Sequence, residues 1–335
     1  MSWKEPKKPV LAPEWTVAKV SIDIQHPMLY ANGRQQSKVV VYIEAQRNFQ
    51  PVKLTATERA SVRLIDYMAP DTEIPFADDT TGESYKGWSA QRESRGYLFH
   101  PATVAQDEAS PDKTTPNADG DYVVLFVTAD ADAVSGTLSL AFVITGDNGW
   151  RYRTDGYVFA PDGTGAPNLL YDTGRDKNVR PEAPVRYGPE QFRLEQRRHA
   201  DEAAVFNDTV TLSIQDGRAI IPLRSMLCTP AGMIHWMDNL PSTQNPCYTG
   251  YAQPGDTQVH WNDAVPVGGQ PRPTLAAAVP DKGVIMLCGR IDIPRRDHVD
   301  PPRGPIEATV IDAYGSDQTC SIGFVTGTRD QLQVT

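Results

Sequence analysis

The sequence predicts an all-β protein built from two antiparallel β-sandwich domains, Ig-like or jelly-roll-like, with little helix. Short alternating apolar runs recur along almost the whole chain, and clusters of turn residues separate them. Alternation with a period of two is typical of half-buried strands, and strands at regular spacing are typical of β-sandwiches. The 28 prolines and 25 glycines follow no period, so we interpret them as turns between strands.

The length and the distribution of turn residues predict two domains. At roughly 150 residues per domain, a chain of 335 residues holds two. Residues 161–189 are rich in proline, glycine, aspartate and arginine, and we interpret them as a linker. The predicted order is an extended proline-rich arm (1–15), a β-sandwich (16–160), the linker, and a second β-rich domain (190–335).

The first domain shows four local signals besides its strands. Asn32-Gly33 predicts a tight turn, because both residues accept a positive φ at low cost. Thr55-Ala-Thr-Glu58 has the spacing of a capping box and predicts one helical turn. Gly146–Gly149 predicts a hairpin, and residues 96–100 are strand-like within a long polar stretch. The expected strands cover 17–24, 39–43, 61–67, 122–128, 137–145 and 150–154.

In the second domain, residues 189–206 predict a short surface helix. A proline begins this segment, and Glu, Gln, Arg and Ala, which favour helices, dominate it. Residues 209–223 predict a hairpin that turns at Asp216-Gly217. Further strands are expected at 233–237, 257–261, 284–293, 307–314 and 319–326.

Two short runs resemble bacterial Ig-like repeats of the invasin type. Residues 30–45 (YANGRQQSKVVVYIEA) are similar to the early strands of such repeats, and residues 307–318 (EATVIDAYGSDQ) are similar to a later part. The resemblance implies a role in adhesion or spacing. It brings no catalytic residues with it.

Charge and hydropathy exclude some partners. The net charge of −10 repels a phosphate backbone, so no nucleic-acid partner is predicted. The basic clusters (Arg193, Arg197 and Arg198; Arg295 and Arg296) lie among acids or prolines and are interpreted as solvated surface. No apolar run is long enough for a transmembrane helix. The first residues lack the apolar core of a Sec signal, so we expect cytoplasmic synthesis, with release or incorporation into a particle by another route.

The four cysteines all lie in the C-terminal half, at Cys228, Cys247, Cys288 and Cys320. None belongs to a C-x-x-C pair, so a zinc knuckle is not indicated. Free buried thiols are favoured over disulfides, although four cysteines allow three pairings. No cofactor is predicted.

A near-repeat in the C-terminal half supplies the candidate binding residues. His235-Trp236-Met-Asp238 is matched by His260-Trp261-Asn-Asp263. On a strand, each histidine would share a face with the residue two positions later, and each tryptophan would point to the other face.

Three interpretations of this repeat remain. His235, Asp238, His260 and Asp263 are residue types that bind metals. Alternatively, Trp236 and Trp261 could stack against a sugar, with Asp238, Asn239 and Asn262 as polar anchors. In the third, structural interpretation, which we favour, each tryptophan is a core residue at a strand end and each aspartate caps the following turn.

The sequence carries no complete catalytic signature, because it lacks a nucleophile elbow and a phosphate-binding loop. It therefore predicts a non-catalytic structural or binding protein of a surface-recognition system, a virion or injection particle, or a toxin assembly. The expected partners are proteins or further copies of the chain, and a glycan is a further candidate. One alternative is an enzyme acting on glycans or peptides near His235 and His260, where Cys228 or Cys247 could pair with His235. Another is a pore-forming toxin subunit, which would need a long amphipathic strand pair rich in Ser and Thr.

Overall fold

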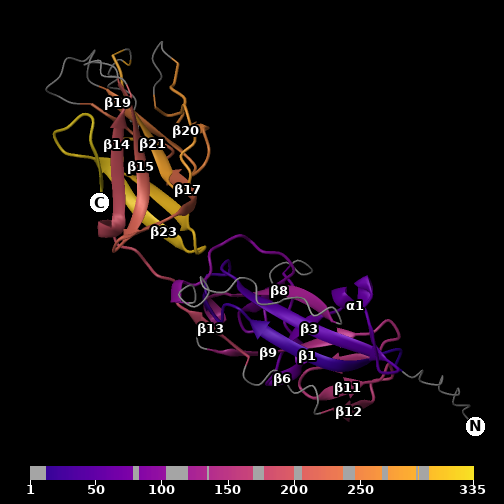
Figure 1. Cartoon of the computed structure of the whole chain (residues 1–335). Helices are drawn as coiled ribbons and strands as arrows, with labels where there is room; N and C mark the ends of the chain where they lie inside the picture. The colour runs from indigo at the N-terminus through magenta and orange to yellow at the C-terminus, as the bar shows by residue number, and fades with distance from the viewer. Residues whose placement is uncertain are drawn as a thin grey trace, which may run out of the picture. The chain divides into compact units, whose positions relative to one another are not determined.

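The computed structural model describes residues 13–77, 83–102, 120–133, 136–168, 177–199, 206–236, 246–265, 271–291, 293 and 302–335. These residues are nearly all β, in several antiparallel sheets, which confirms the all-β part of the prediction. The chain divides into two compact units, Met1–Pro184 and Val185–Thr335 (Figure 1). Among the helices described, none has the length and apolar character needed to cross a membrane.

The N-terminal unit contains two sheets whose apolar side chains meet in one core. The five-stranded sheet has the order β1-β3-β8-β7 with β4 on β3: β1 Thr16–Ile24, β3 Ser37–Arg47, β8 Asp121–Ala129, β7 Trp88–Gln91 and β4 Gln50–Val52. The eight-stranded sheet has the order β12-β11-β10-β9-β13-β2, with β5 between β9 and β6: β12 Gly165–Pro167, β11 Tyr157–Phe159, β10 Arg151–Arg153, β9 Leu138–Thr145, β13 Asn178–Glu182, β2 Met28–Tyr30, β5 Arg63–Asp66 and β6 Ala69–Glu73. The pairs are antiparallel, except that β13 and β2 run parallel.

Local signals in this unit have mixed outcomes. The capping box is confirmed, because Thr55 and Glu58 cap helix α1 (Ala56–Ala60) reciprocally. The hairpin at Gly146–Gly149 is also confirmed, since it joins β9 to β10. The strand expected at residues 96–100 is wrong, because that segment is irregular. A 3-10 turn (η1, Ala131–Ala133) follows β8. Residues 161–189, which we interpreted as a linker, supply β12 and β13 to the eight-stranded sheet.

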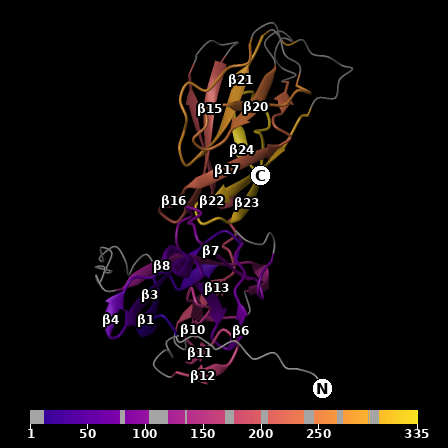
Figure 2. The same cartoon turned by 90° about the vertical axis from the view of Figure 1, so that its right-hand side faces the viewer.

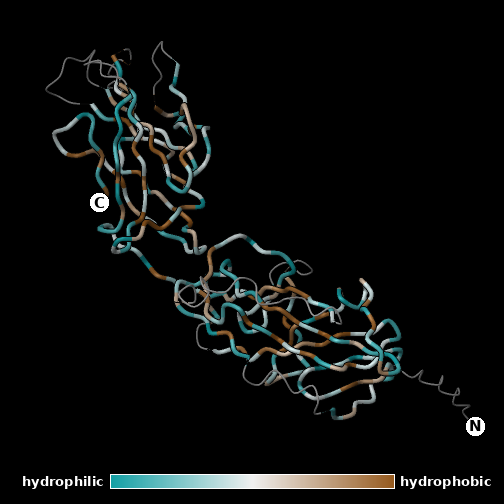
Figure 3. The backbone as a smooth tube through the Cα atoms, in the orientation of Figure 1, coloured by the Kyte–Doolittle hydropathy of each residue, from teal (hydrophilic) through white to brown (hydrophobic). Residues whose placement is uncertain are grey.

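The C-terminal unit also contains two sheets, seen from a second direction in Figure 2. The seven-stranded sheet has the order β14-β15-β21-β19-β18, with β16 on β15 and β20 on β19: β14 Phe192–Arg198, β15 Phe206–Asp216, β21 Gly283–Gly289, β19 Cys247–Ala252, β18 Ile234–His235, β16 Ala219–Ile221 and β20 Val259–Trp261. The four-stranded sheet has the order β17-β22-β23-β24: β17 Leu223–Thr229, β22 Ile306–Asp312, β23 Asp317–Phe324 and β24 Leu332–Val334. Residues of both sheets share one apolar core, and apolar and polar residues alternate along strands such as β15 and β22 (Figure 3).

The helix predicted at residues 189–206 is wrong. Within the described residues 189–199, a 3-10 turn (η3, Pro189–Gln191) is the only helical element, and Phe192–Arg198 is the edge strand β14. All seven residues of β14 pair with β15, and Phe192 is buried in the core between the sheets. Charged residues are common on edge strands, where they oppose pairing with other chains. Here pairing with β15 overrides the helix propensity of Glu, Gln and Arg.

All four cysteines are free and buried, as the sequence favours. Burial raises the pKa of the Cys228, Cys247 and Cys320 thiols to about 12 and also raises that of Cys288. The thiols are therefore protonated at neutral pH and pack as small apolar groups.

Candidate functional site

The seven-stranded sheet has two different faces. We call the face toward the four-stranded sheet the inner face and the opposite one the outer face. Residues directly opposite each other on paired strands point to the same face, so the register defines rows across the sheet. One outer row runs from β14 to β20 through Arg197, Thr209, Met286, Gly250 and Trp261. The outer face thus changes from polar on β14 and β15 to apolar on β21, β19 and β20.

An irregular segment, residues 271–280, covers the apolar part of the outer face. We call it the strap. Leu275 and Val279 of the strap pack with Met286 and other outer-face residues in an apolar cluster that is separate from the core between the sheets. The Gly255 N–H donates a hydrogen bond to the Val279 carbonyl at 2.8 Å, which fixes one end of the strap.

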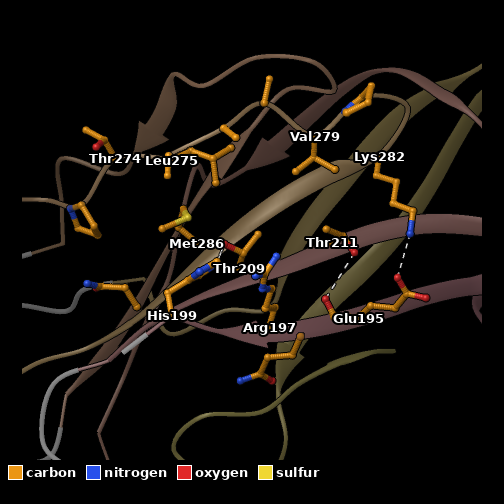
Figure 4. A pocket seen from close by; sticks show the side chains of 17 residues that line it. Glu195, Arg197, His199, Thr209, Thr211, Thr274, Leu275, Val279, Lys282 and Met286 are labelled. Atoms are coloured by element: carbon orange, nitrogen blue, oxygen red, sulfur yellow. Dashed lines mark hydrogen bonds and ion pairs between the residues drawn. The ribbon is translucent and has the colours of Figure 1, made fainter. Parts of the chain in front are cut away.

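A cleft of about 860 Å³ lies between the strap and the polar part of the outer face (Figure 4). This volume is within the usual range for small-molecule sites, roughly 300–1,000 Å³. The polar floor comes from alternate residues of β14 and its continuation, from β15, and from Lys282 beside β21: Glu195, Arg197, His199, Asn207, Thr209, Thr211 and Lys282. The apolar wall comes mainly from the strap, with Met286 beneath it.

The floor carries two cations and one anion. Lys282 Nζ donates to Glu195 Oε2 at 2.9 Å, and this hydrogen bond lowers the pKa of the Glu195 carboxyl. His199 Nε2 lies 2.5 Å from Thr209 Oγ1. Arg197 makes no hydrogen bond or ion pair within the described part of the chain, so its guanidinium is available to a ligand. The charge on this floor is therefore positive, although the whole chain carries −10.

The two predicted histidines do not meet. His235 lies opposite Cys247 and His260 lies opposite Tyr251, both on β19. These positions on β19 are four residues apart, about 13 Å at strand spacing. The His235 ring stacks on Phe324 with a centroid distance of 4.9 Å, and the His260 ring stacks on Tyr251 at the same distance. Both histidines belong to the inner face and are separated from the cleft by the sheet.

The two predicted tryptophans contribute to the apolar cluster on the outer face. Both are partly buried against it. The centroids of the Trp261 and Tyr248 rings are 5.4 Å apart, and the Arg272 guanidinium lies 5.9 Å from the Trp261 ring centroid. Neither tryptophan lines the cleft. The alternation expected from the sequence, with histidine on one face and tryptophan on the other, is present in β20.

The predicted aspartates do not complete a site. The Asp263 side chain is fully exposed and lies 3.4 Å from Arg272. The turn after β20 is capped by Asn262 instead, whose Oδ1 accepts from the Ala264 N–H at 2.9 Å. Asp238 lies outside the described residues. In the described ranges, no group of three or more His, Cys, Asp or Glu side chains is arranged to hold a metal ion.

One of the predicted cysteine–histidine pairs consists of cross-strand neighbours: His235 of β18 lies directly opposite Cys247 of β19. A nucleophilic cysteine needs a lowered pKa, since the thiolate is the reactive form. Burial raises the pKa of Cys247 to about 12, so this thiol is not prepared for nucleophilic attack at neutral pH.

Sequence reasoning missed the cleft residues. One signal was available in the sequence. Glu195, Arg197 and His199 are two residues apart from one another, as residues on one face of a strand are, but the segment was interpreted as a helix. The strap could not be connected to β14 from the sequence, because the two are about 80 residues apart. The chain matches no protein-family model, and no curated protein matches its sequence.

Proposed function

We propose that the protein is a non-catalytic binding protein of a larger assembly, such as a surface-recognition system, a virion or injection particle, or a toxin complex, and that the cleft is its binding site. We also propose that each unit is a β-sandwich of the Ig-like or jelly-roll kind. The apolar core shared by two sheets in each unit supports the second proposal.

The cleft itself carries the functional proposal. It combines a polar floor on regular strands with an apolar wall, and binding sites usually have this composition. Strands hold floor residues more firmly than loops do, which lowers the entropy lost on binding. The alternative of an enzyme around His235 and His260 has less support, because each ring is stacked on a different aromatic residue.

Blocking the cleft should abolish ligand binding without unfolding the protein. The probe is 1-anilinonaphthalene-8-sulfonate, an amphipathic anion whose fluorescence rises in apolar sites. We expect a single saturable site on the native chain and its loss in Ala277→Trp, because exposed Ala277 lines the cleft and an indole there would fill it. Ile220→Trp is the matched control, since Ile220 is 55% exposed and does not line the cleft. Equal titrations of both variants, or no saturable binding, would contradict the proposal.

The assembly part of the proposal also has a surface feature in its favour. Phe49, at the turn between β3 and β4, is 88% exposed and has a φ of 62°. A bulky residue in this conformation is strained, and such strain tends to persist where function requires it. The aromatic ring is therefore a candidate contact with a partner or a second copy.

The mass in solution tests self-association. We expect light scattering to show species above the 36.9 kDa of one chain as the concentration rises. Phe49→Ser should shift this equilibrium toward the monomer, whereas Met68→Ser, which changes another exposed apolar residue (75% exposed), should not. A strict monomer at every concentration would count against a particle component.

A further inference from the structure

The cation on the cleft floor indicates the charge of the ligand. Arg197 has no partner within the described residues, whereas Lys282 is already paired with Glu195. Arginine presents a fork of N–H donors that matches a carboxylate in two parallel hydrogen bonds. The neighbouring Arg193, on the same face of β14, bonds instead to Gln215 and to the Glu190 carbonyl. Arg197 is thus the floor residue that is free to bind an anion.

A second floor group can accept a hydrogen bond from the ligand. The Asn207 side-chain oxygen is buried and has no hydrogen-bond partner in the described structure. A buried acceptor without a donor costs free energy, so turning the Asn207 amide toward a ligand N–H or O–H in the cleft would be favoured. On β15, Asn207 is two residues before Thr209 and shares its face. Thr209 lies directly opposite Arg197 of β14. The two groups are therefore diagonal neighbours on one face, about 7–8 Å apart at the backbone.

The wall opposite these groups is apolar. Leu275 and Val279 of the strap and Met286 of β21 line it. Short strap residues, Ala276 to Ala278, leave room beside them. An aliphatic side chain placed here would lose contact with water without unpairing any polar group.

We propose that the cleft binds a carboxylate that carries an adjacent N–H and a branched aliphatic group, which is the chemistry of an N-acylated apolar amino acid. The carboxylate pairs with Arg197, the Asn207 amide turns into the cleft so that its Oδ1 accepts from the N–H, and the aliphatic group packs against Leu275 and Val279. This inference rests on the proposed function of the cleft as a binding site. Both a free N-acyl amino acid and a peptide that ends in an apolar residue offer this chemistry.

Calorimetry with three small probes tests each contact. We expect N-acetyl-L-leucine to bind at least about tenfold more tightly than N-acetyl-L-leucinamide, which lacks the carboxylate. We expect 4-methylpentanoate, which lacks the N–H, to bind more weakly than N-acetyl-L-leucine as well. Arg197→Gln should reduce the affinity for N-acetyl-L-leucine about tenfold and abolish the preference over the amide. Arg193→Gln is the matched control and should change the affinity by less than about twofold.

A peptide arm distinguishes the two sources of the ligand. Acetyl-Ala-Ala-Ala-Leu with a free carboxylate should bind more tightly than N-acetyl-L-leucine if the ligand is a peptide end, and no more tightly if it is a small acid. Equal binding of the acid and amide probes, or equal effects of the two arginine substitutions, would overturn the proposed ligand class. Binding of the anilinonaphthalene probe without binding of N-acetyl-L-leucine would overturn the ligand class alone. If neither the anilinonaphthalene probe nor N-acetyl-L-leucine binds, the proposed binding function is overturned too.

Discussion

Replacing Glu58 with glutamine should destabilise the N-terminal unit almost as strongly as replacing it with alanine. Glu58 is 3% exposed and accepts hydrogen bonds from three N–H groups. Its Oε1 accepts from Trp15 Nε1 at 2.5 Å and from the Asp147 N–H at 3.2 Å, and its Oε2 accepts from the Thr55 N–H at 2.9 Å. Glutamine has one acceptor oxygen, so its NH₂ group would face at least one of these donors. Each buried donor left without an acceptor costs about 1–3 kcal/mol, so we expect a loss of about 2–3 kcal/mol for glutamine and of about 3–4 kcal/mol for alanine, where water can reach part of the space left.

The measurement must assign the loss to one unit, because a chain of two units need not unfold in a single step. Hydrogen exchange followed by mass spectrometry should show faster exchange in peptides of the N-terminal unit and unchanged exchange in the C-terminal unit. Thr55→Ala is the control, since it removes the side-chain cap of the same helix and an exposed hydrogen bond to Asp147 Oδ2 but leaves Glu58 in place; it should cost about 1 kcal/mol. A Glu58→Gln variant that is no less stable than Thr55→Ala would show that the three hydrogen bonds do not act as described.

Features set by neighbouring residues were predictable from the sequence. The capping box needs only Thr55 and Glu58, three positions apart, and it is present. The β15–β16 hairpin turns at Asp216-Gly217 because Gly217, with a φ of 58°, adopts a conformation that glycine tolerates. Such signals depend on local backbone preferences, which the order of residues expresses directly.

Features set by distant pairing were not predictable. The Trp15–Glu58 hydrogen bond spans 43 residues, and the cleft joins β14 to a strap about 80 residues later. The helix predicted for residues 189–206 was wrong for the same reason, because the strand depends on pairing with β15. The near-repeat of His, Trp and Asp attracted attention as a motif. In the fold the described parts of both copies lie along one edge of β19, and their histidine and tryptophan rings pack against other side chains.

Asp208 connects the stability of the C-terminal unit to the cleft. Its side chain is fully buried on the face opposite the cleft floor, between Asn207 and Thr209 in the sequence. It accepts hydrogen bonds from Gln196 and Arg198 of β14. These contacts hold the edge strand whose alternate residues, Glu195 and Arg197, face the ligand.

Asp208→Ala should therefore lower both stability and ligand affinity, although Asp208 does not line the cleft. Removing one partner of a buried ion pair costs about 3–5 kcal/mol; because the Arg198 side chain is 37% exposed, solvent screening reduces the expected loss to about 2–3 kcal/mol. Urea unfolding measures this loss, and calorimetry with N-acetyl-L-leucine should show weaker binding once β14 is less firmly held. Asp330→Ala is the control, because Asp330 also pairs with Arg198 but is 38% exposed, and it should cost below about 1 kcal/mol. If both variants lose the same stability and keep full affinity, the edge strand is positioned by its backbone pairing with β15 alone.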